Sequence, residues 1–359
     1  MQKNNKNSQG YILVLTMMII SIMVLVVTQM FYQGTAHLAF SRTVINTQKA
    51  KMLSLGGLQL TISKLSVVPK KEAKKPEQTQ AAGSEQKPQK DDQGKKLLKK
   101  LLPIINRWQT INLKESIEGV EGQIKICITC ENGKININKL YDYANHKFLG
   151  QGQTKGDTKK VLEQIFKKLE DITGKKNMFY SLQQFLQKRK YPLNDITELL
   201  EIADYSYFKD RVFYEPIDQK GKSLKDVYLT DIFTTWTEDA KIQPWLFSDS
   251  LCGVLGLRRV EGKDFETRKQ SAEQWIENFK PKFQPDLDWS KIFKPIYNKD
   301  LSGLPKDFDT ILDTQFAPNI FSVISSSIVD NVAQNLFAIL QIQKKGDSVV
   351  VKLKKLYWI

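Results

Sequence analysis

The sequence predicts an α+β fold in which a long N-terminal helix packs on an antiparallel sheet and a mainly helical segment interrupts that sheet. Three observations support this prediction. Residues 10–32 form an uncharged apolar stretch, residues 122–138 and 321–359 alternate apolar and polar positions as strands do, and residues 158–203 carry apolar residues at helical spacing. Strands, then helices, then strands again indicate an insertion within one sheet.

The apolar stretch is long enough to cross a membrane, because about 20 residues rising about 1.5 Å each span the hydrocarbon core. Its only polar interruptions are Thr16, Ser21, Thr28 and Gln29. Lys3 and Lys6 precede it, and the other flank stays uncharged until Arg42, so the positive-inside rule places the leader in the cytoplasm and the body across the membrane. A cleaved signal peptide has a shorter apolar region and an A-x-A-like site, and neither is present. We therefore expect a retained helix.

The helical spacing continues beyond the apolar stretch, which predicts one helix reaching to about Val67. Gly56 and Gly57 predict either a bend or close packing, because glycine disfavours a helix interior. Residues 69–96 are rich in Lys, Gln, Glu, Pro and Asp and predict a disordered linker. Residues 97–108 predict a short helix, broken near Pro103, that docks on the domain.

The Glu131-Asn132-Gly133 turn between alternating runs predicts a β-hairpin within residues 122–138. Either Asn194 or Asp195 can cap a third helix in the 158–203 block, and Glu198 sits near the position that completes a capping box. Further along, we expect a strand at 226–236, a capped helix at 247–257, a helix around 272–279, an irregular stretch at 285–313 and a closing strand meander.

The net charge of +15 does not by itself indicate nucleic-acid binding, because much of the lysine lies in one low-complexity segment and no recognition motif accompanies it. Nucleic acid is therefore a minor candidate partner. An anionic membrane surface or acidic proteins would suit the same charge. Cys127 and Cys130 fall on opposite faces of a strand, so these two and Cys252 are expected to be buried free thiols rather than disulfides or zinc ligands.

No catalytic motif is present: the sequence lacks G-x-S-x-G, a P-loop and H-E-x-x-H, so we expect no enzyme. Glu131 and Asp142 are interpreted as surface or turn carboxylates. An acidic, irregular segment is the one candidate for calcium, but it lacks the glycine and terminal glutamate of an EF-hand loop, so turn and cap roles are favoured. Its carboxylates are Asp286, Asp288, Asp307, Asp309 and Asp313.

Several of these residues together resemble a known family. Gly10 followed by Tyr11 and the apolar run resembles a prepilin signal, and the body motifs are E-N-G-K-I-N-I-N at 131–138, P-L-N-D-I-T-E-L-L at 192–200 and K-I-Q-P-W at 241–245. The chain resembles the minor pseudopilin K (general secretion pathway protein K) family of type II secretion, within the type IV pilin-like superfamily. Leu15 stands where pilins generally carry a glutamate. The lack of this glutamate resembles a trait of the family that is linked to a position at the filament tip.

The resemblance implies a function and a set of partners. A prepilin peptidase would cut after Gly10 and methylate Tyr11, and the protein would sit in the inner membrane with its body in the periplasm. It would assemble with other minor pseudopilins and the major pseudopilin on the inner-membrane platform, and meet secreted cargo or the outer-membrane channel. Calcium is implied by the resemblance alone. The implied organisation is a leader (1–10), a transmembrane and stalk helix (11–68), a linker (69–96), a pilin-like domain (97–138 and 317–359) and an inserted helical domain (139–316).

The sequence also departs from the family. Met178 to Lys190 replaces the acidic block expected before Pro192, and Gln243-Pro244 stands where a second pair of asparagines is expected, so no calcium ligand is transferred to this chain. Two alternatives stay open: a minor pilin of a type IV pilus, in adhesion or DNA uptake, and a signal-anchored cell-envelope binding protein. A membrane-anchored hydrolase is a more distant third.

Overall fold

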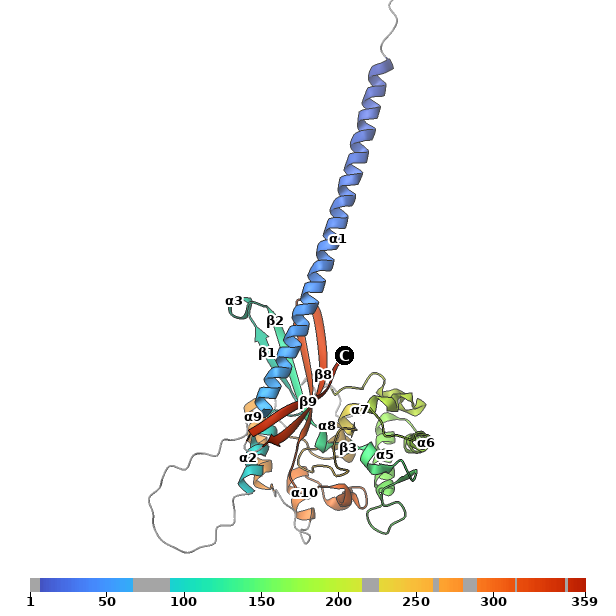
Figure 1. The fold of residues 1–359 in the computed structure, drawn as a ribbon, viewed down its shortest axis with the longest axis vertical. Coiled ribbons are helices and arrows are strands. Elements are labelled where there is room, and N and C mark those ends of the chain that lie inside the picture. Colours follow the sequence, from blue (N-terminus) through green and yellow to red (C-terminus); the bar gives the residue numbers. More distant parts are fainter. Residues whose placement is uncertain are drawn as a thin grey trace, which may run out of the picture.

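The computed structural model describes residues 7–66, 91–214, 226–260, 265–279, 289–313, 315–345 and 348–359. One helix, α1 (Asn7–Ser66), is 60 residues long and extends well clear of the body, as Figure 1 shows. Its second half packs on a five-stranded antiparallel sheet of order β1-β2-β7-β8-β9. The strands are β1 (Trp108–Leu113), β2 (Gly122–Cys130), β7 (Ile320–Val329), β8 (Val332–Lys345) and β9 (Ser348–Trp358). The predicted α+β fold, a long helix packed on an antiparallel sheet, is confirmed.

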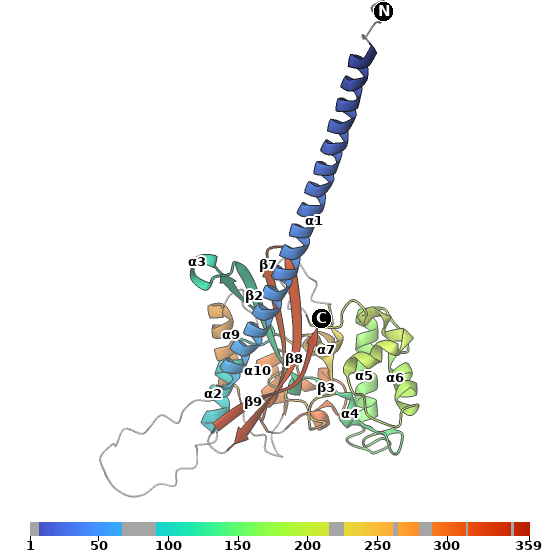
Figure 2. The ribbon, with the colours of Figure 1, turned by 45° about the horizontal axis from the view of Figure 1, so that its top comes forward.

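The second half of α1 buries one face against the sheet. The buried positions recur at three- and four-residue intervals, so they lie on one side of the helix. They are Ala50, Ser54, Gly57, Leu58, Thr61 and Leu65. The prediction that one continuous helix extends past the apolar stretch is confirmed, and Figure 2 shows the lower part of α1 lying along β2, β7 and β8.

Gly57 allows α1 to approach the sheet closely. A Cβ atom built at this position would lie 2.3 Å from Ser325 Oγ and 3.0 Å from Ile124 Cγ2, whereas a Cβ at Gly56 meets nothing within 4 Å. The helix runs through both glycines without a break. Of the two expectations for this glycine pair, close packing therefore holds, and it rests on Gly57 alone.

We predict that Gly57→Leu destabilises the protein and that Gly56→Leu does not. Leucine at 57 overpacks the contact with the sheet, at a cost of roughly 1–3 kcal/mol. Leucine at 56 enters open space and gains about 1 kcal/mol of helix propensity. Chemical denaturation of the full chain in detergent measures both variants. Equal effects of the two substitutions would show that the close approach at Gly57 is not needed.

The chain between β2 and β7 forms short helices and small strands that lie beside and beyond the end of the sheet (Figure 1). The larger helices are α5 (Thr158–Thr173), α6 (Met178–Gln187), α8 (Asp249–Leu255), α9 (Phe265–Glu277) and α10 (Trp289–Tyr297). The shorter ones are η1 (Glu131–Gly133), α4 (Ile137–Leu140), η2 (Ile196–Glu201), η3 (Ala203–Phe208), α7 (Leu229–Ile232), η4 (Leu301–Gly303) and η5 (Phe308–Ile311). Two-stranded pairs are β3 (Ile135–Asn136) with β6 (Phe233–Thr234), and β4 (Tyr141–Asp142) with β5 (Lys147–Phe148). Before β2 lie α2 (Asp91–Leu101) and α3 (Glu115–Glu118).

The two faces of the sheet pack against different parts of the chain. The face toward α1 belongs to the main core, which is continuous with the buried residues of the short helices. The opposite face carries a second cluster of Cys127, Ile320, Ile324, Phe337 and Ile339, covered by Tyr214 and Tyr228. We call it the far face. The buried residues of the central strands therefore pack against two different parts of the chain, one on each face.

The prediction for the cysteines is confirmed. Cys127 lies in the far-face cluster, Cys130 lies in the main core, and both are buried and free, as is Cys252. Burial raises the pKa of Cys130 to about 12 and raises those of the other two thiols as well. These residues therefore act as small apolar side chains.

The predicted hairpin within residues 122–138 is wrong. Residues 131–133 form η1, and Ile135 and Asn136 pair in parallel with β6, while β2 pairs with β1 and β7. The reason is tertiary: a Cβ at Gly133 would lie 1.6 Å from the carbonyl oxygen of Leu246, so this glycine packs against another segment instead of turning a hairpin.

Of the other local predictions, some are confirmed and some are wrong. The closing meander, the capped helix near 250, the helix at 272–279 and the Asp195–Glu198 capping box are confirmed, although the capped segment is a 3-10 helix. Of the predicted 226–236 strand, residues 229–232 form the helix α7 and only residues 233–234 form a strand, β6, and the irregular 285–313 stretch contains α10. Residues 91–96 of the predicted linker are helical, and residues 69–90 lie outside the described residues.

Candidate functional site

The first half of α1 projects into its surroundings without any partner among the described residues. Every side chain from Tyr11 to Ile45 is exposed, and the first buried residue is Ala50. Within the described part of the chain, α1 is the one helix long and apolar enough to cross a membrane. An exposed apolar surface of this length is stable only in contact with lipid or with other apolar helices.

The hydroxyl groups of Thr16, Ser21 and Thr28 in this exposed half donate hydrogen bonds to backbone carbonyls of the same helix. Thr16 Oγ1 donates to Leu13 O at 2.9 Å and Ser21 Oγ donates to Met17 O at 2.8 Å, while Thr28 donates to the carbonyl of Val24. A hydroxyl bonded to its own helix leaves no unpaired donor toward hydrocarbon, where an unpaired polar group costs several kcal/mol. These interruptions are therefore compatible with an apolar environment.

The predicted processing residues lie near the start of the helix. Gly10 falls in the first turns of α1, Tyr11 is 72% exposed and Leu15 is 46% exposed. Tyr11 and Leu15 are four residues apart and share one helix face. The structure brings them close to no other described element, so cleavage after Gly10 and the tip-type role of Leu15 stay predictions.

Hydroxyl and amide contacts fix the depth at which the buried half of α1 sits on the sheet. Ser54 Oγ lies 2.8 Å from Ser327 Oγ and donates to Gln334 O at 2.9 Å, and Ser327 Oγ donates to Ala50 O at 2.5 Å. Near the exposed half, Asn46 Nδ2 donates to Asp330 Oδ2 at 2.6 Å. Because these are directional contacts, a shift of the helix by one residue would break them.

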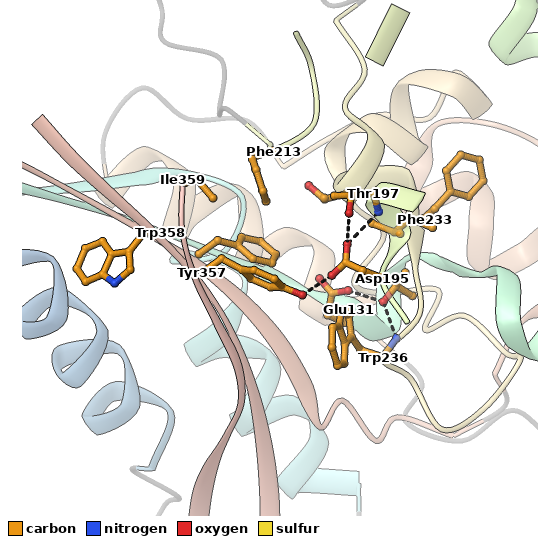
Figure 3. Close-up of a pocket in the computed structure, with 13 residues that line it drawn as sticks. Glu131, Asp195, Thr197, Phe213, Phe233, Trp236, Tyr357, Trp358 and Ile359 are labelled. Atoms are coloured by element: carbon orange, nitrogen blue, oxygen red, sulfur yellow. Dashed lines mark hydrogen bonds between the residues drawn. The ribbon is translucent and has the colours of Figure 1, made fainter. Parts of the chain in front are cut away.

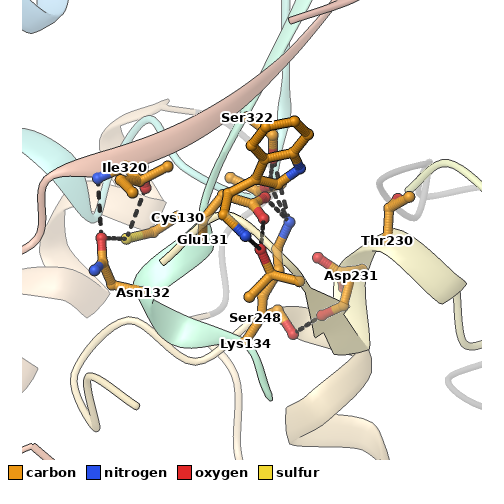
Figure 4. Close-up of polar contacts among 12 residues, drawn as sticks. Cys130, Glu131, Asn132, Lys134, Thr230, Asp231, Ser248, Ile320 and Ser322 are labelled. Carbon is orange, nitrogen blue, oxygen red and sulfur yellow. Dashed lines mark hydrogen bonds and ion pairs between the residues drawn. The ribbon is translucent and has the colours of Figure 1, made fainter. Parts of the chain in front are cut away.

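A buried ion pair lies where the chain leaves the sheet. Lys134 pairs with Glu131 and donates to Thr129 Oγ1 at 3.0 Å and to Ser322 Oγ at 3.2 Å, while Thr234 donates to the other oxygen of Glu131 (Figure 4). Both charged side chains are at most 3% exposed. The interpretation of Glu131 as a surface carboxylate is therefore wrong, whereas its position in the turn η1 agrees with the alternative of a turn residue. The three-residue spacing of Glu and Lys was the signal that could have indicated the pair.

Asparagines of the 131–138 motif connect the sheet to the helices. Asn132 Oδ1 accepts from the backbone of Asn319 and Ile320 at 3.0 and 2.9 Å, next to the first residue of β7. Asn136 Nδ2 donates to Thr237, and Asn138 binds the backbone of Leu193 through both its Nδ2 and its Oδ1, each at 2.8 Å. Sequence analysis found this motif by resemblance but did not assign these contacts.

Gln243, like these asparagines, connects distant segments of the chain through hydrogen bonds. Its backbone N–H donates to Asn132 O at 2.6 Å, and its side chain donates to Asp313 and, at 2.8 Å, to Gln315 O. The side chain is 2% exposed. Gln243 therefore joins the 131–133 turn to the segment that leads into β7.

The acidic candidates for calcium do not gather in the described residues. Asp313 accepts hydrogen bonds from Gln243 and from the backbone of Gln315, and Asp307 has a left-handed backbone at the start of η5. No group of three or more His, Cys, Asp or Glu side chains with metal-binding geometry occurs among the described residues. Asp286 and Asp288 lie outside them. Asp313 has a turn role through its bond from Gln315 N, whereas Asp307 precedes η5 without a side-chain cap bond.

A second buried carboxylate, Asp231, lies in surroundings that disfavour its ionised form. Ser250 N donates to its Oδ2 at 2.7 Å, while its Oδ1 has no partner. Burial, with a smaller contribution from Asp249, raises the pKa of Asp231 to about 6, although Lys134 acts in the opposite direction. The ionised form therefore destabilises the fold.

We predict that removing Lys134 destabilises the protein strongly. Lys134→Met leaves Glu131 buried without its counterion, which costs roughly 3–5 kcal/mol. The double variant Lys134→Met/Glu131→Gln should lose less than the sum of the two single variants. Denaturation of the four proteins measures the cycle. Lys159→Met serves as control, because the exposed Lys159–Glu163 pair should contribute below about 1 kcal/mol; an equal loss there would contradict the prediction.

We predict that the Asp231→Asn variant gains stability relative to the wild type as pH rises. The folded-state pKa is about 6, above the ordinary value of 3.8, so the folded protein holds the proton longer and wild-type stability falls between those pH values. The advantage of the variant should grow across this window to at most about 3 kcal/mol and then level off. Unfolding curves at several pH values measure it.

Asp142→Asn provides the control for this pH series. Hydrogen bonds from the Asn145 side chain and backbone lower the pKa of Asp142, so its ionised form is favoured in the fold. Its replacement should become less favourable as pH rises, which is the opposite sign. A pH-independent effect of Asp231→Asn would show that the carboxyl group is not perturbed.

The comparisons with known proteins found matches among solved structures. No protein-family model matches the chain, and no curated protein matches it. Among solved structures, the chain is similar to a chain of the GspK-GspI-GspJ complex from the type 2 secretion system of enterotoxigenic Escherichia coli. The TM-score is 0.46 at 13% sequence identity, and the match covers 89% of this chain and 98% of that chain.

Proposed function

We propose that the chain is a minor pseudopilin at the tip of a type II secretion pseudopilus, with a structural and not a catalytic role. One observation carries the proposal: α1 is divided into a half that the sheet holds and an apolar half that nothing in the described chain covers. A simple membrane anchor needs a span but needs no rigid continuation fixed along a sheet. A filament subunit needs both.

The division of α1 suits two successive environments. In the membrane, lipid surrounds the exposed half, whose hydroxyls are already bonded within the helix. In a filament, apolar helices of neighbouring subunits replace the lipid, and van der Waals packing drives their association. The same surface therefore serves for storage in the inner membrane and for assembly, and the body would lie in the periplasm with the leader in the cytoplasm.

Two features favour the tip position. Leu15 offers no carboxylate to the amino group of a neighbouring subunit, and at the tip no subunit above would require one. A carboxylate buried there without a partner would be costly. The helices between β2 and β7 lie beside and beyond the end of the sheet farthest from the apolar half of α1. We propose that residues 139–316 form an inserted domain that caps the filament and faces cargo or the outer-membrane channel.

The proposal is tested by mass spectrometry and cross-linking of the full chain in cells with their own prepilin peptidase. We expect an N-terminus at Tyr11 carrying a methyl group, with other minor pseudopilins and the major pseudopilin captured through cysteines placed at exposed α1 positions such as Val14. Gly10→Val should retain the leader and lose these cross-links, because the leader would keep the helix in the membrane.

The controls separate the remaining possibilities. Cysteine at the buried position Leu58 should capture no partner, since the sheet covers it. An intact Met1 in the mature protein would overturn the processing step and with it the filament role. A processed chain cross-linked only to pilus subunits would instead place the protein in a type IV pilus.

A further inference from the structure

A cavity of about 140 Å³ lies between the end of β9, the strand β6 and the start of η2, where the sheet meets the inserted helices. Aromatic residues are the commonest in its wall: Phe213, Phe233, Trp236, Phe337, Tyr357 and Trp358. Figure 3 shows Tyr357 reaching from β9 toward Asp195, with Trp236 beside them. Ligand sites commonly occur at such junctions and combine apolar walls with a few placed polar groups.

Asp195 supplies the polar group of this aromatic pocket. Its Oδ1 accepts from Thr197 N at 2.9 Å and from Thr197 Oγ1 at 2.8 Å, and its Oδ2 accepts from the hydroxyl of Tyr357. A carboxylate offers about four acceptor positions, so Oδ2 keeps one for a ligand. Burial and the bond to Asp195 raise the pKa of Tyr357, so its phenol stays protonated and continues to hold the carboxylate in place.

The charge of Asp195 is not balanced within the described chain. Its described partners are a backbone N–H and two hydroxyl groups, all uncharged. Glu131 also lines the pocket, but Lys134 pairs with it. The charge of Asp195 is therefore left without a counterion among the described residues. A negative charge beside the faces of several aromatic rings favours a cation, because the rings attract cations through their quadrupoles.

The size of the pocket narrows the class of cation. At about 140 Å³ the pocket is smaller than the roughly 300–1,000 Å³ typical of sites for drug-sized ligands. Such a space suits a slim chain ending in an ammonium group, whereas the planar fork of a guanidinium is broader. The open acceptor on Oδ2 can take one N–H from an ammonium, and the apolar walls can enclose the methylene stem.

We propose that this aromatic pocket binds the side chain of a lysine presented by a partner protein. The ammonium group bonds to Asp195 Oδ2, and the methylenes lie among Phe213, Trp236 and Tyr357. The site does not depend on the pseudopilin role, because it follows from the pocket and its charge alone. It places a specific recognition point on the body, at the junction that joins the sheet to the inserted helices.

The test measures binding of N-acetyl-lysine methylamide to the full chain in detergent by ligand-observed NMR. The neutral probe N-acetyl-norleucine methylamide has the same stem without the charge. We expect the lysine probe to bind at least about tenfold more tightly, in line with one charge-assisted hydrogen bond. Equal binding of both probes, or no binding of the lysine probe up to about 20 mM, would overturn the proposal.

Variants assign the difference to Asp195. Asp195→Asn keeps an N-cap residue for η2 but removes the charge, so the preference for the lysine probe should disappear. Glu198→Gln is the matched control: it removes a charge from the same capping box without lining the pocket, and the preference should persist. Loss of the preference in Glu198→Gln alone would contradict the assignment, as would tighter binding of N-acetyl-arginine methylamide than of the lysine probe.

Discussion

The structure depends on the close contact between α1 and the sheet at Gly57. This contact lets one rigid helix serve two environments, since one face of the helix is buried from Ala50 onward and the residues before about position 46 are exposed. The apolar half has no fold of its own to hold it straight, so its direction is set by the buried half. Serine contacts reinforce this because they fix the register of the helix along β7. Hydrophobic packing alone is non-directional and would allow sliding.

The 131–138 segment is the second constraint, because it directs the chain out of the sheet. Lys134 and Glu131 neutralise each other inside the core, and Asn132, Asn136 and Asn138 carry hydrogen bonds to three distant segments. Buried polar groups of this kind are costly unless every partner is in place. The inserted helices are therefore tied to one arrangement relative to the sheet, which a purely apolar junction would not specify.

The sequence was sufficient for those features that arise from local pattern. The long helix, the closing strands and the Asp195 capping box follow from periodicity and spacing, and each is confirmed. Features decided by distant contacts were not predictable. The Asn-Gly turn lost its hairpin because Leu246, more than a hundred residues away, packs on Gly133.

The features of the candidate site also separate into those that local sequence predicts and those that distant contacts decide. The apolar half of α1 could be predicted because a membrane-spanning helix is a local property of composition. The burial of Glu131 and the aromatic pocket at Asp195 could not, since their members come from segments far apart in the sequence. Asp195 itself was found only as a capping residue, and its second contact, with Tyr357, requires the folded sheet.

The contacts on the two faces of the sheet determine how a displacement of α1 would be transmitted to the sheet and the inserted helices. On the face toward α1, hydroxyl contacts and a glycine fitted to Ser325 oppose sliding by even one residue. On the far face, aromatic packing and the buried ion pair fix the inserted helices. Close-packed interiors transmit displacement with little compression. A helix drawn out of the membrane would therefore carry the sheet and the inserted helices with it as one unit, and the aromatic pocket at their junction would keep its shape during that movement.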